Sequence, residues 1–375
     1  MIILAIESSC DDTSVALLDA SDEGIIVLEQ KTASQIDIHK KYGGVVPEVA
    51  ARRHAEVILP VVETVMTSLS VGSYTGMTHS PNKPDAIAVT SGPGLITGLM
   101  VGIEVAKTLS YTWNVPLIGV NHIEGHIHSS ILNDKFQISN FKKNAFPAVC
   151  LIVSGGHTEL ILMKDFGVYE KIGGTRDDAA GEAFDKVAKL LGLEYPGGPK
   201  ISEYGKTGNP HAIRFPRPMA DSDDFDFSFS GLKTAALYWL RDNSLQEINT
   251  NPFGAIASWF GTKKDGITKN DFCASIEQAI VDVLVKKTMN AIKKYKPKSL
   301  ILGGGVSNNT KLRETLVYAA APELGKEHIH IPEREYTMDN AAMIGAAAYF
   351  RLKKGEHISR KDIQPDPNWK VYDKK

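Results

Sequence analysis

The sequence contains the same order of elements twice, and this internal repeat strongly limits the folds that the chain can adopt. Residues 3–18 are typical of a strand, a small polar turn and a returning strand, and residues 148–163 repeat the same plan. Each segment therefore predicts a hairpin with a small, polar tip. A chain built on two such copies is expected to have two similar halves.

A second pair of matching elements follows each hairpin. The apolar residues 86–89 run into the glycine turn 90–94, and the apolar residues 299–302 run into the glycine turn 303–309. A helical stretch follows each turn. A strand, a glycine turn and a helix start present backbone N–H groups and the positive end of the helix dipole, which together attract phosphate.

The spacing of the repeated elements indicates an insertion in the second half. The hairpin tips, at Ser8 and Ser154, are 146 residues apart, whereas the glycine turns, at Gly92 and Gly304, are 212 residues apart. The second half therefore carries about 66 additional residues. We place this helical insertion at about 165–270.

This duplicated plan resembles the actin, Hsp70 and sugar-kinase superfamily, an α/β class in which two lobes enclose a nucleotide cleft. The resemblance implies phosphate loops at the hairpin tips and a nucleoside on the last glycine turn. We expect a first lobe of residues 1–130 with 335–352, a second lobe of residues 131–334 and a C-terminal tail of residues 353–375. The alternative is that the repeats are unrelated turns.

Two histidines, His122 and His126, lie four residues apart directly after a strand expected at 115–120. On a helix such residues lie one turn apart and can both ligate one divalent cation. Two partly exposed helix histidines are the alternative interpretation. Zincin peptidases need the order His-Glu-x-x-His, whereas here Glu124 stands second after His122, so peptidase chemistry is not supported.

Asp339 is the best candidate for a third ligand. It precedes a helix of small residues expected at 340–349, so its alternative role is that of a helix N-cap. Two histidines and one carboxylate leave coordination positions open. This set is typical of a catalytic or substrate-orienting metal site rather than a sealed structural one.

Three further carboxylates could take part in chemistry. Asp11 and Asp12, at the first hairpin tip, could hold Mg²⁺ through water or accept a proton from an attacking amine, or they could simply cap a turn. Asp185 falls on the polar face of a helix expected at 176–191. It could accept hydrogen bonds from hydroxyl groups of a substrate or be a solvated helix acid.

The composition limits how the protein can interact with nucleic acid. The formal net charge of −2 and the isoelectric point near 6.6 give no overall attraction to nucleic acid, so RNA contacts require local patches or a partner. Residues 52–53 and 293–298 are basic and are candidate patches for RNA contact, with solvated faces as the alternative.

The longest apolar stretch, 95–113, contains charged residues, so no membrane span is expected. Three isolated cysteines without CxxC spacing favour a reducing cytoplasm: Cys10, Cys150 and Cys273.

About ten motifs occur in an order that is specific to one family. They are residues 6–13 (IESSCDDT), 42–48 (YGGVVPE), 91–94 (SGPG), 122–126 (HIEGH), 153–158 (VSGGHT), 177–186, 195–199 (YPGGP), 227–234 (FSFSGLKT), 304–307 (GGVS) and Asp339. With them, residues 2–352 resemble the universal tRNA N6-adenosine threonylcarbamoyltransferase family in its bacterial TsaD-type form.

The resemblance implies an acyl transfer. The threonylcarbamoyl group of threonylcarbamoyl-adenylate would move to the N6 amine of adenosine 37, just 3′ of the anticodon, in tRNAs reading ANN codons, and AMP would leave. It implies that His122, His126 and Asp339 match the family's metal ligands, which usually bind iron or zinc, and we expect Fe²⁺, with Zn²⁺ as the alternative. Asp11 is our hypothesis for proton handling. The implied adenylate-binding residues are Ile152, Val153, Ser154, Gly155, Gly156, Asp185, Gly198 and Asn309.

The family resemblance also implies partners: tRNA, a noncatalytic TsaB-type paralogue, a small TsaE-type P-loop ATPase and a TsaC-type enzyme that makes the adenylate. The competing classes are an ATP-dependent phosphotransferase of the same superfamily, which needs no histidine pair, and a scaffold paralogue without metal ligands. The chain departs from the family at Asp12, commonly Glu, and at Asn308, usually Ala. The loops 72–83 and 243–270 and the tail after residue 353 look longer than usual.

Overall fold

The computed structural model describes residues 1–70, 83–132, 138, 141, 144–243, 266–357 and 359–373. Most of the loop expected at 72–83 and of the insertion expected at 243–270 lies outside these residues. Among the described residues, no helix combines the length and the apolar character that crossing a membrane requires.

The first half of the chain forms a five-stranded sheet with the order β3-β2-β1-β4-β5. Strand β1 runs antiparallel to β2 and parallel to β4. The strands are β1 (Ile2–Glu7), β2 (Thr13–Ala20), β3 (Ile25–Ala33), β4 (Ala86–Gly92) and β5 (Leu117–Asn121). The helices are α1 (Ile36–His39), α2 (Pro47–Ser70), α3 (Ile96–Trp113) and α4 (His122–His128).

The second half repeats this topology in a sheet whose order, β8-β7-β6-β9-β10, matches the first strand for strand. Strand β6 is antiparallel to β7 and parallel to β9. The strands are β6 (Ala148–Val153), β7 (Thr158–Asp165), β8 (Val168–Gly174), β9 (Ser299–Gly303) and β10 (Ile329–His330). The helices are α6 (Ala180–Leu190), α7 (Gly197–Gly205), α8 (Ser230–Asn243), α9 (Lys269–Tyr295), α10 (Thr310–Leu324) and α11 (Ala341–Lys353).

This correspondence confirms the expected duplicated two-lobe α/β fold. Helix α3 follows β4 as α10 follows β9, and α4 follows β5 as α11 follows β10. The region 165–270, expected as a helical insertion, also contains β8, which pairs with β7 in the sheet. The helices α6, α7 and α8 come only after that strand.

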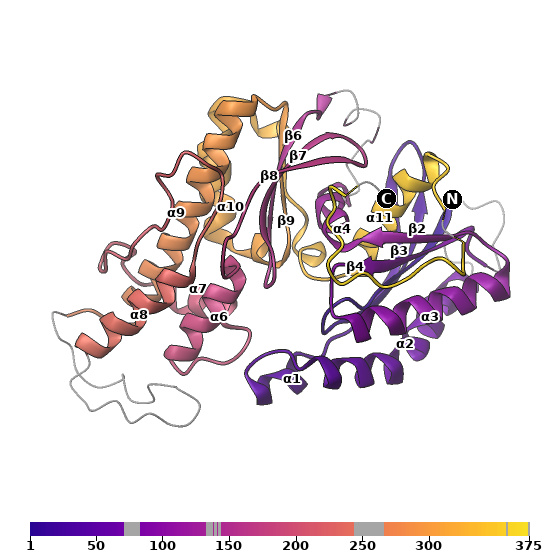
Figure 1. The fold of residues 1–375 in the computed structure, drawn as a ribbon, viewed down its shortest axis with the longest axis horizontal. Coiled ribbons are helices and arrows are strands. Elements are labelled where there is room, and N and C mark those ends of the chain that lie inside the picture. The colour runs from indigo at the N-terminus through magenta and orange to yellow at the C-terminus, as the bar shows by residue number, and fades with distance from the viewer. Residues whose placement is uncertain are drawn as a thin grey trace.

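Alternation along the strands explains how the layers pack. Ile3 and Ala5 of β1 join the central core with α4 and α11, whereas Leu4 and Ile6 face a separate core under α2 and α3. Strand β6 alternates in the same way, since Ala148, Cys150 and Ile152 belong to the central core and the residues between them face the outer helices. Both faces of the sheets are covered, which explains the unbroken apolar runs. Figure 1 shows α4 and α11 between the two sheets.

Helix α11 returns from the end of the second half to the first sheet. It contacts β1, β2, β5 and α4. Its small residues allow this close approach, and a side chain at Gly345 would collide with Leu18. The consequence is that the segment just before α11, which includes Asp339, lies beside α4.

The glycine turn after β9 provides a test of the fold. Gly304 has φ of 87° and ψ of 161°, a conformation that side chains other than glycine rarely adopt, and a Cβ there would collide with the Val153 carbonyl oxygen. We expect Gly304→Ala to lower the free energy of unfolding by about 1–3 kcal/mol, measured by urea denaturation. Gly155→Ala is the control, because a Cβ at that position meets no atom within 4 Å. Equal stability of the two variants would contradict this explanation.

Candidate metal centre

Helix α4 begins at the carboxyl end of β5, and its first two turns carry the histidine pair. Asn121 is the N-cap, and its Oδ1 accepts hydrogen bonds from the backbone N–H groups of Ile123 (2.9 Å) and Glu124 (3.4 Å). This cap fixes where the helix starts. The rings of His122 and His126 therefore lie together, with centroids 4.6 Å apart, and both side chains are buried.

Asp339 lies beside this pair. Its Oδ1 is 3.5 Å from His122 Nε2 and 3.3 Å from His126 Nε2. The alternative role of N-cap belongs instead to Asn340, whose Oδ1 accepts from the Met343 N–H at 2.9 Å, so the Asp339 carboxylate faces the histidines. One ligand atom from each of the three residues lies within 4.8 Å of the others, so the group could hold a metal ion.

The hydrogen bonding of His126 fits such an ion. Both of its ring nitrogens are buried, and neither makes a hydrogen bond to any described residue. A buried polar atom without a partner costs about 1–3 kcal/mol, and nitrogen ligation of a cation would remove this cost at Nε2. The three side chains therefore suit a divalent metal.

Glu7 supports His122 from the opposite side. It is fully buried at the end of β1, and its Oε2 lies 3.0 Å from His122 Nδ1. Glu7 also accepts from Thr90 Oγ1 and from the Ser9 N–H, both at 2.6 Å. Because an ionised carboxylate only accepts, Nδ1 donates and Nε2 is left to face Asp339. The sequence did not predict this role of Glu7. The signal that could have indicated it is a glutamate at the end of an otherwise apolar strand.

The charges of this cluster shift one another's pKa values. Burial disfavours a charged His122, but the carboxylates of Asp339 and Glu7 outweigh it and raise the pKa of His122 to about 9. Burial likewise opposes ionisation of Asp339, yet the nearby histidines hold its pKa well below the usual value. For His126, burial and then the charge of His122 lower the pKa. The centre therefore keeps its carboxylates ionised and His126 neutral.

The first hairpin tip, between β1 and β2, lies next to this centre. His54 on α2 braces it, because its Nδ1 is 2.7 Å from Thr13 Oγ1 and its Nε2 is 3.0 Å from the Cys10 carbonyl oxygen. Asp12 Oδ1 is buried without a hydrogen-bond partner among the described residues. Burial and then the Asp11 charge raise the pKa of Asp12 to about 6, although the Ser34 hydroxyl opposes the shift.

The charge of Asp11 acts on groups of the second lobe. Burial and then the charges of Glu182 and Asp11 raise the pKa of Asp185 of α6, and burial and then the Asp11 charge raise the pKa of Tyr195. Asp185 is not a solvated helix acid, because its Oδ1 accepts from the Gly197 N–H at 2.7 Å, at the start of α7. Gly198 is the next residue of that turn. The two lobes thus bring Asp11 and Asp185 towards the same region.

The second hairpin tip presents Gly155 and Gly156 to open space, and a Cβ at either position would meet no atom within 4 Å. Ser154 shapes the tip, because its N–H donates to the His157 carbonyl oxygen at 2.8 Å and its Oγ accepts from the His157 N–H at 3.1 Å. Ile152 and Val153 lie buried in β6 behind it. Burial and then the charges of the neighbouring histidines lower the pKa of His157 to about 4.

Asn309 holds together elements of the second lobe. It is the N-cap of α10, and its Oδ1 accepts from the Leu312 N–H at 2.8 Å. Its Nδ2 donates to Glu277 Oε1 at 2.7 Å and to Ser202 Oγ at 2.9 Å. The side-chain amide is therefore engaged within the second lobe.

The duplicated topology defines a two-lobe protein of the actin, Hsp70 and sugar-kinase class. The His-His-Asp group between the lobes adds a site that could hold a metal ion. Solved structures agree with the fold. HypF of T. kodakarensis superposes with a TM-score of 0.59 at 12% identity, over 96% of this chain and 49% of HypF. A full-length HypF in a phosphate- and nucleotide-bound form gives 0.57 at 12% identity, over 95% of this chain and 47% of HypF.

Sequence comparison identifies the family. Residues 26–346 match the TsaD model, described as tRNA N6-adenosine threonylcarbamoyltransferase. A protein of that name from Clostridium kluyveri is 46% identical over 98% of this chain and 97% of its own length. Another from Anaeromyxobacter dehalogenans is 42% identical over 98% and 99%. The chain belongs to the TsaD family, as its motifs predicted, and is thus a threonylcarbamoyltransferase rather than a kinase or scaffold.

The raised pKa of Asp12 predicts a pH-dependent loss of stability. The folded-state pKa of Asp12, about 6, exceeds its ordinary value of 3.8. The contribution of Asp12 to the stability of the folded state relative to the unfolded state is therefore highest below about pH 4 and falls as the pH rises through 6. We expect Asp12→Asn to be more stable than the natural chain by up to about 3 kcal/mol at pH 7.5, and by less at pH 5. Urea denaturation at both pH values measures this, with the exposed Asp223→Asn as control. A pH-independent difference would contradict the prediction.

Proposed function

We propose that this chain transfers the threonylcarbamoyl group from threonylcarbamoyl-adenylate to the N6 amine of adenosine 37 in tRNAs reading ANN codons, between its two lobes. The observation that carries the proposal is the His122, His126 and Asp339 group, found in a chain that belongs to the TsaD family. The acyl donor is a mixed carbamic-phosphoric anhydride and is already activated. The protein therefore needs to orient the amine, stabilise the leaving phosphate and accept one proton.

We assign adenylate binding to the second lobe. The open glycine tip supports this, because backbone N–H groups without side chains allow the close approach that a phosphate requires. We propose that the Asp185 carboxylate accepts a hydrogen bond from a ribose or substrate hydroxyl. The proposed set is Ile152, Val153, Ser154, Gly155, Gly156, Asp185, Gly198 and Asn309. The engaged amide of Asn309 limits its part to shaping the turn or to backbone contact.

We assign the metal to His122, His126 and Asp339, and propose Fe²⁺ as the ion, with Zn²⁺ as the alternative. Two imidazoles and one carboxylate with open positions suit both ions. When bound, such an ion supplies a Lewis acid for a phosphate or carbonyl oxygen. Glu7 holds His122 in the tautomer that ligation needs.

We propose Asp11 as the group that accepts the proton. The N6 nitrogen attacks the carbamoyl carbon, the bond from that carbon to the phosphate oxygen breaks, AMP leaves, and the amine proton passes to the Asp11 carboxylate. Its half-buried position at the first hairpin tip, where its charge acts on Asp185 and Tyr195 of the second lobe, supports this role. Asp12 is less suited, because its Oδ1 is buried.

The remaining assignments rest on the family and on packing. We propose lobes of residues 1–130 with 335–352 and of residues 131–334, with a tail at 353–375; the packing of α11 on the first sheet supports this division. We propose a TsaB-type paralogue, a TsaE-type ATPase and a TsaC-type enzyme as partners. Three free cysteines and a tRNA substrate support a cytoplasmic location.

The assay for this function combines the protein with an adenylate-forming enzyme, threonine, bicarbonate, ATP, tRNA and the proposed partners. Threonylcarbamoyladenosine is then quantified in nucleoside digests by mass spectrometry. We expect His126→Ala and Asp339→Ala to lower both metal content and product yield at least about tenfold, because each removes a ligand. His211→Ala, an exposed histidine of the second lobe, is the matched control. Unchanged yield in the ligand variants would disprove the metal assignment.

Asp11→Asn tests the proton acceptor separately. We expect the transfer rate to fall by about 10²–10⁴ while metal content stays that of the natural chain, since the residue is not a ligand. Asp19→Asn, at the opposite end of the same hairpin, is the control. A full rate for Asp11→Asn in single-turnover measurements would show that another group accepts the proton.

A further inference from the structure

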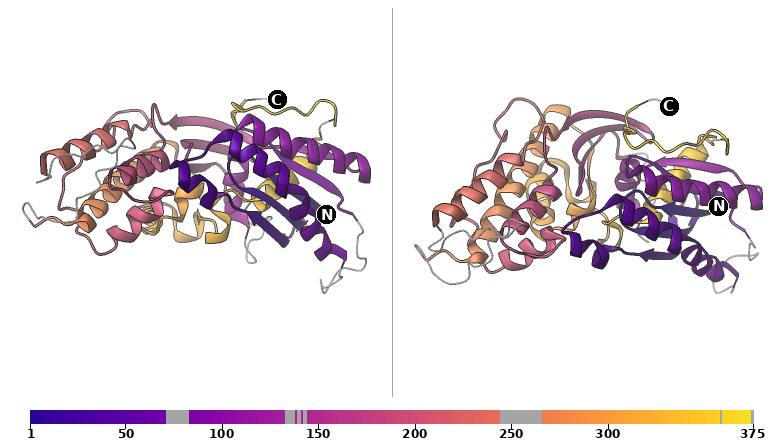
Figure 2. Two further views of the ribbon diagram at one scale, coloured as in Figure 1. Left: turned by 90° about the horizontal axis from the view of Figure 1, so that it is seen from below. Right: turned by 60° about the horizontal axis from the view of Figure 1, so that its bottom comes forward.

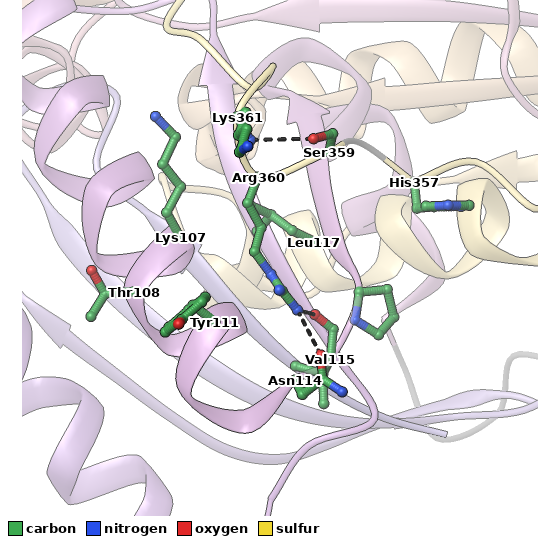
Figure 3. Close-up of a pocket in the computed structure, with 11 residues that line it drawn as sticks. Lys107, Thr108, Tyr111, Asn114, Val115, Leu117, His357, Ser359, Arg360 and Lys361 are labelled. Carbon is green, nitrogen blue, oxygen red and sulfur yellow. Dashed lines mark hydrogen bonds between the residues drawn. The ribbon is translucent and has the colours of Figure 1, made fainter.

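The C-terminal tail returns along the first lobe after α11, as both views of Figure 2 show. One anchor is Arg360, in a pocket of about 740 Å³ formed by the end of α3, the start of β5 and the tail (Figure 3). Its Nε donates to Ser110 Oγ at 2.8 Å, and a terminal nitrogen donates to the Val115 carbonyl oxygen at 3.3 Å. This anchor lies at the end of β5 remote from α4.

A second anchor lies on the glycine turn after β4. The Asp366 N–H donates to the Ser91 carbonyl oxygen at 2.7 Å, and the Gly94 N–H donates to that of Pro367 at 3.3 Å. Gly92 permits this contact, since a Cβ there would collide with the Asp366 carbonyl oxygen. The tail is therefore fitted closely to the first lobe next to the start of α4.

The tail then contacts α4 directly. Asn121, the N-cap of α4, donates from Nδ2 to the Trp369 carbonyl oxygen at 3.0 Å. The Trp369 side chain is only 5% exposed. The same Asn121 side chain thus caps the metal-binding helix through its oxygen and binds the tail through its nitrogen.

A buried ion pair holds the first turn of α4. Glu124 is 1% exposed and accepts from Arg351 of α11, at 2.8 Å from Nε and 2.7 Å from a terminal nitrogen. It also accepts from the Tyr169 hydroxyl of β8 at 3.1 Å. The Arg351 guanidinium in turn lies 5.4 Å from the ring centre of Trp369, within the range of a cation–π contact.

These contacts connect α4, α11 and the tail to one another beside the metal ligands. Helix α4 carries His122 and His126, and α11 follows Asp339; the Glu124–Arg351 pair joins the two helices and Trp369 contacts both. We propose that Arg351 and Trp369 are positioning residues of the metal centre, which fix α4 relative to Asp339 and so set the affinity and geometry of metal binding. The inference rests on the proposed metal site and assigns a role to the tail.

The test uses Co²⁺ as a spectroscopic probe bound to the full-length protein. In Arg351→Met and in Trp369→Leu we expect the Co²⁺ dissociation constant to rise about 10–100-fold and the visible absorption bands to shift, because outer contacts orient the ligands. A role in stability alone would lower the melting temperature and leave the bands unchanged. Trp369→Phe retains an aromatic face and should restore the natural spectrum.

Arg217→Met is the matched control, because Arg217 makes a comparable two-nitrogen ion pair with Asp282 in the second lobe, at 3.0 and 2.7 Å. It should leave Co²⁺ binding unchanged. If Arg351→Met does not fold, Trp369→Leu and Trp369→Phe decide the question. Natural affinity and spectrum in folded Arg351→Met or Trp369→Leu would overturn the inference. Equal Co²⁺ binding by the natural chain and Asp339→Ala would instead show that the metal site itself is wrongly assigned.

Discussion

The close packing of α4 against α11 is the contact on which the candidate site depends. Gly125 makes it possible, because a Cβ at that position would lie 2.8 Å from Ile344 Cδ1 and 3.1 Å from Met343 Cγ. The histidines come from one helix and the carboxylate from the segment before the other, so any separation of the helices would disperse the ligands. The small residues of α11 are thus as necessary to the site as the ligands themselves.

The duplicated sheets determine where this contact forms. Both helices follow the last strand of their sheet, and the central core packs them between the two sheets. The turns after β4 and β9 lie at the carboxyl ends of parallel strands, the edge where open α/β sheets commonly bind ligands. Gly303 brings the second turn against α4, since a Cβ there would lie 2.5 Å from the His126 carbonyl oxygen. The metal ligands and the glycine turns after β4 and β9 consequently lie at the same edge of the sheets.

The electrostatics of the site follow from burying several carboxylates together. Glu7 and Asp339 stay ionised because His122 lies between them, and burial and then the charges of His122 and His126 lower the pKa of His157. Burial and then the charge of Asp11 raise the pKa of Asp12 instead. Further from the ligands, Glu124 is neutralised by Arg351, which itself packs against the tail. Each buried charge thus has a named partner or a shifted pKa, as low-dielectric surroundings require.

The sequence by itself determined the duplicated fold and the histidine pair, because apolar periodicity, glycine turns and His-x-x-x-His spacing are local patterns. The order of its motifs indicated the family, and Asp339 became a candidate ligand only through that resemblance and the expected closure of the two lobes. The sequence left open whether Asp339 caps its helix, and it missed Glu7, Arg351 and Trp369 as neighbours of the site. Only the tertiary structure decided these points: Asn340 takes the cap, and residues 7, 124, 351 and 369 meet through contacts between distant segments. Such contacts depend on how helices and strands pack in three dimensions, which no local spacing in the chain encodes.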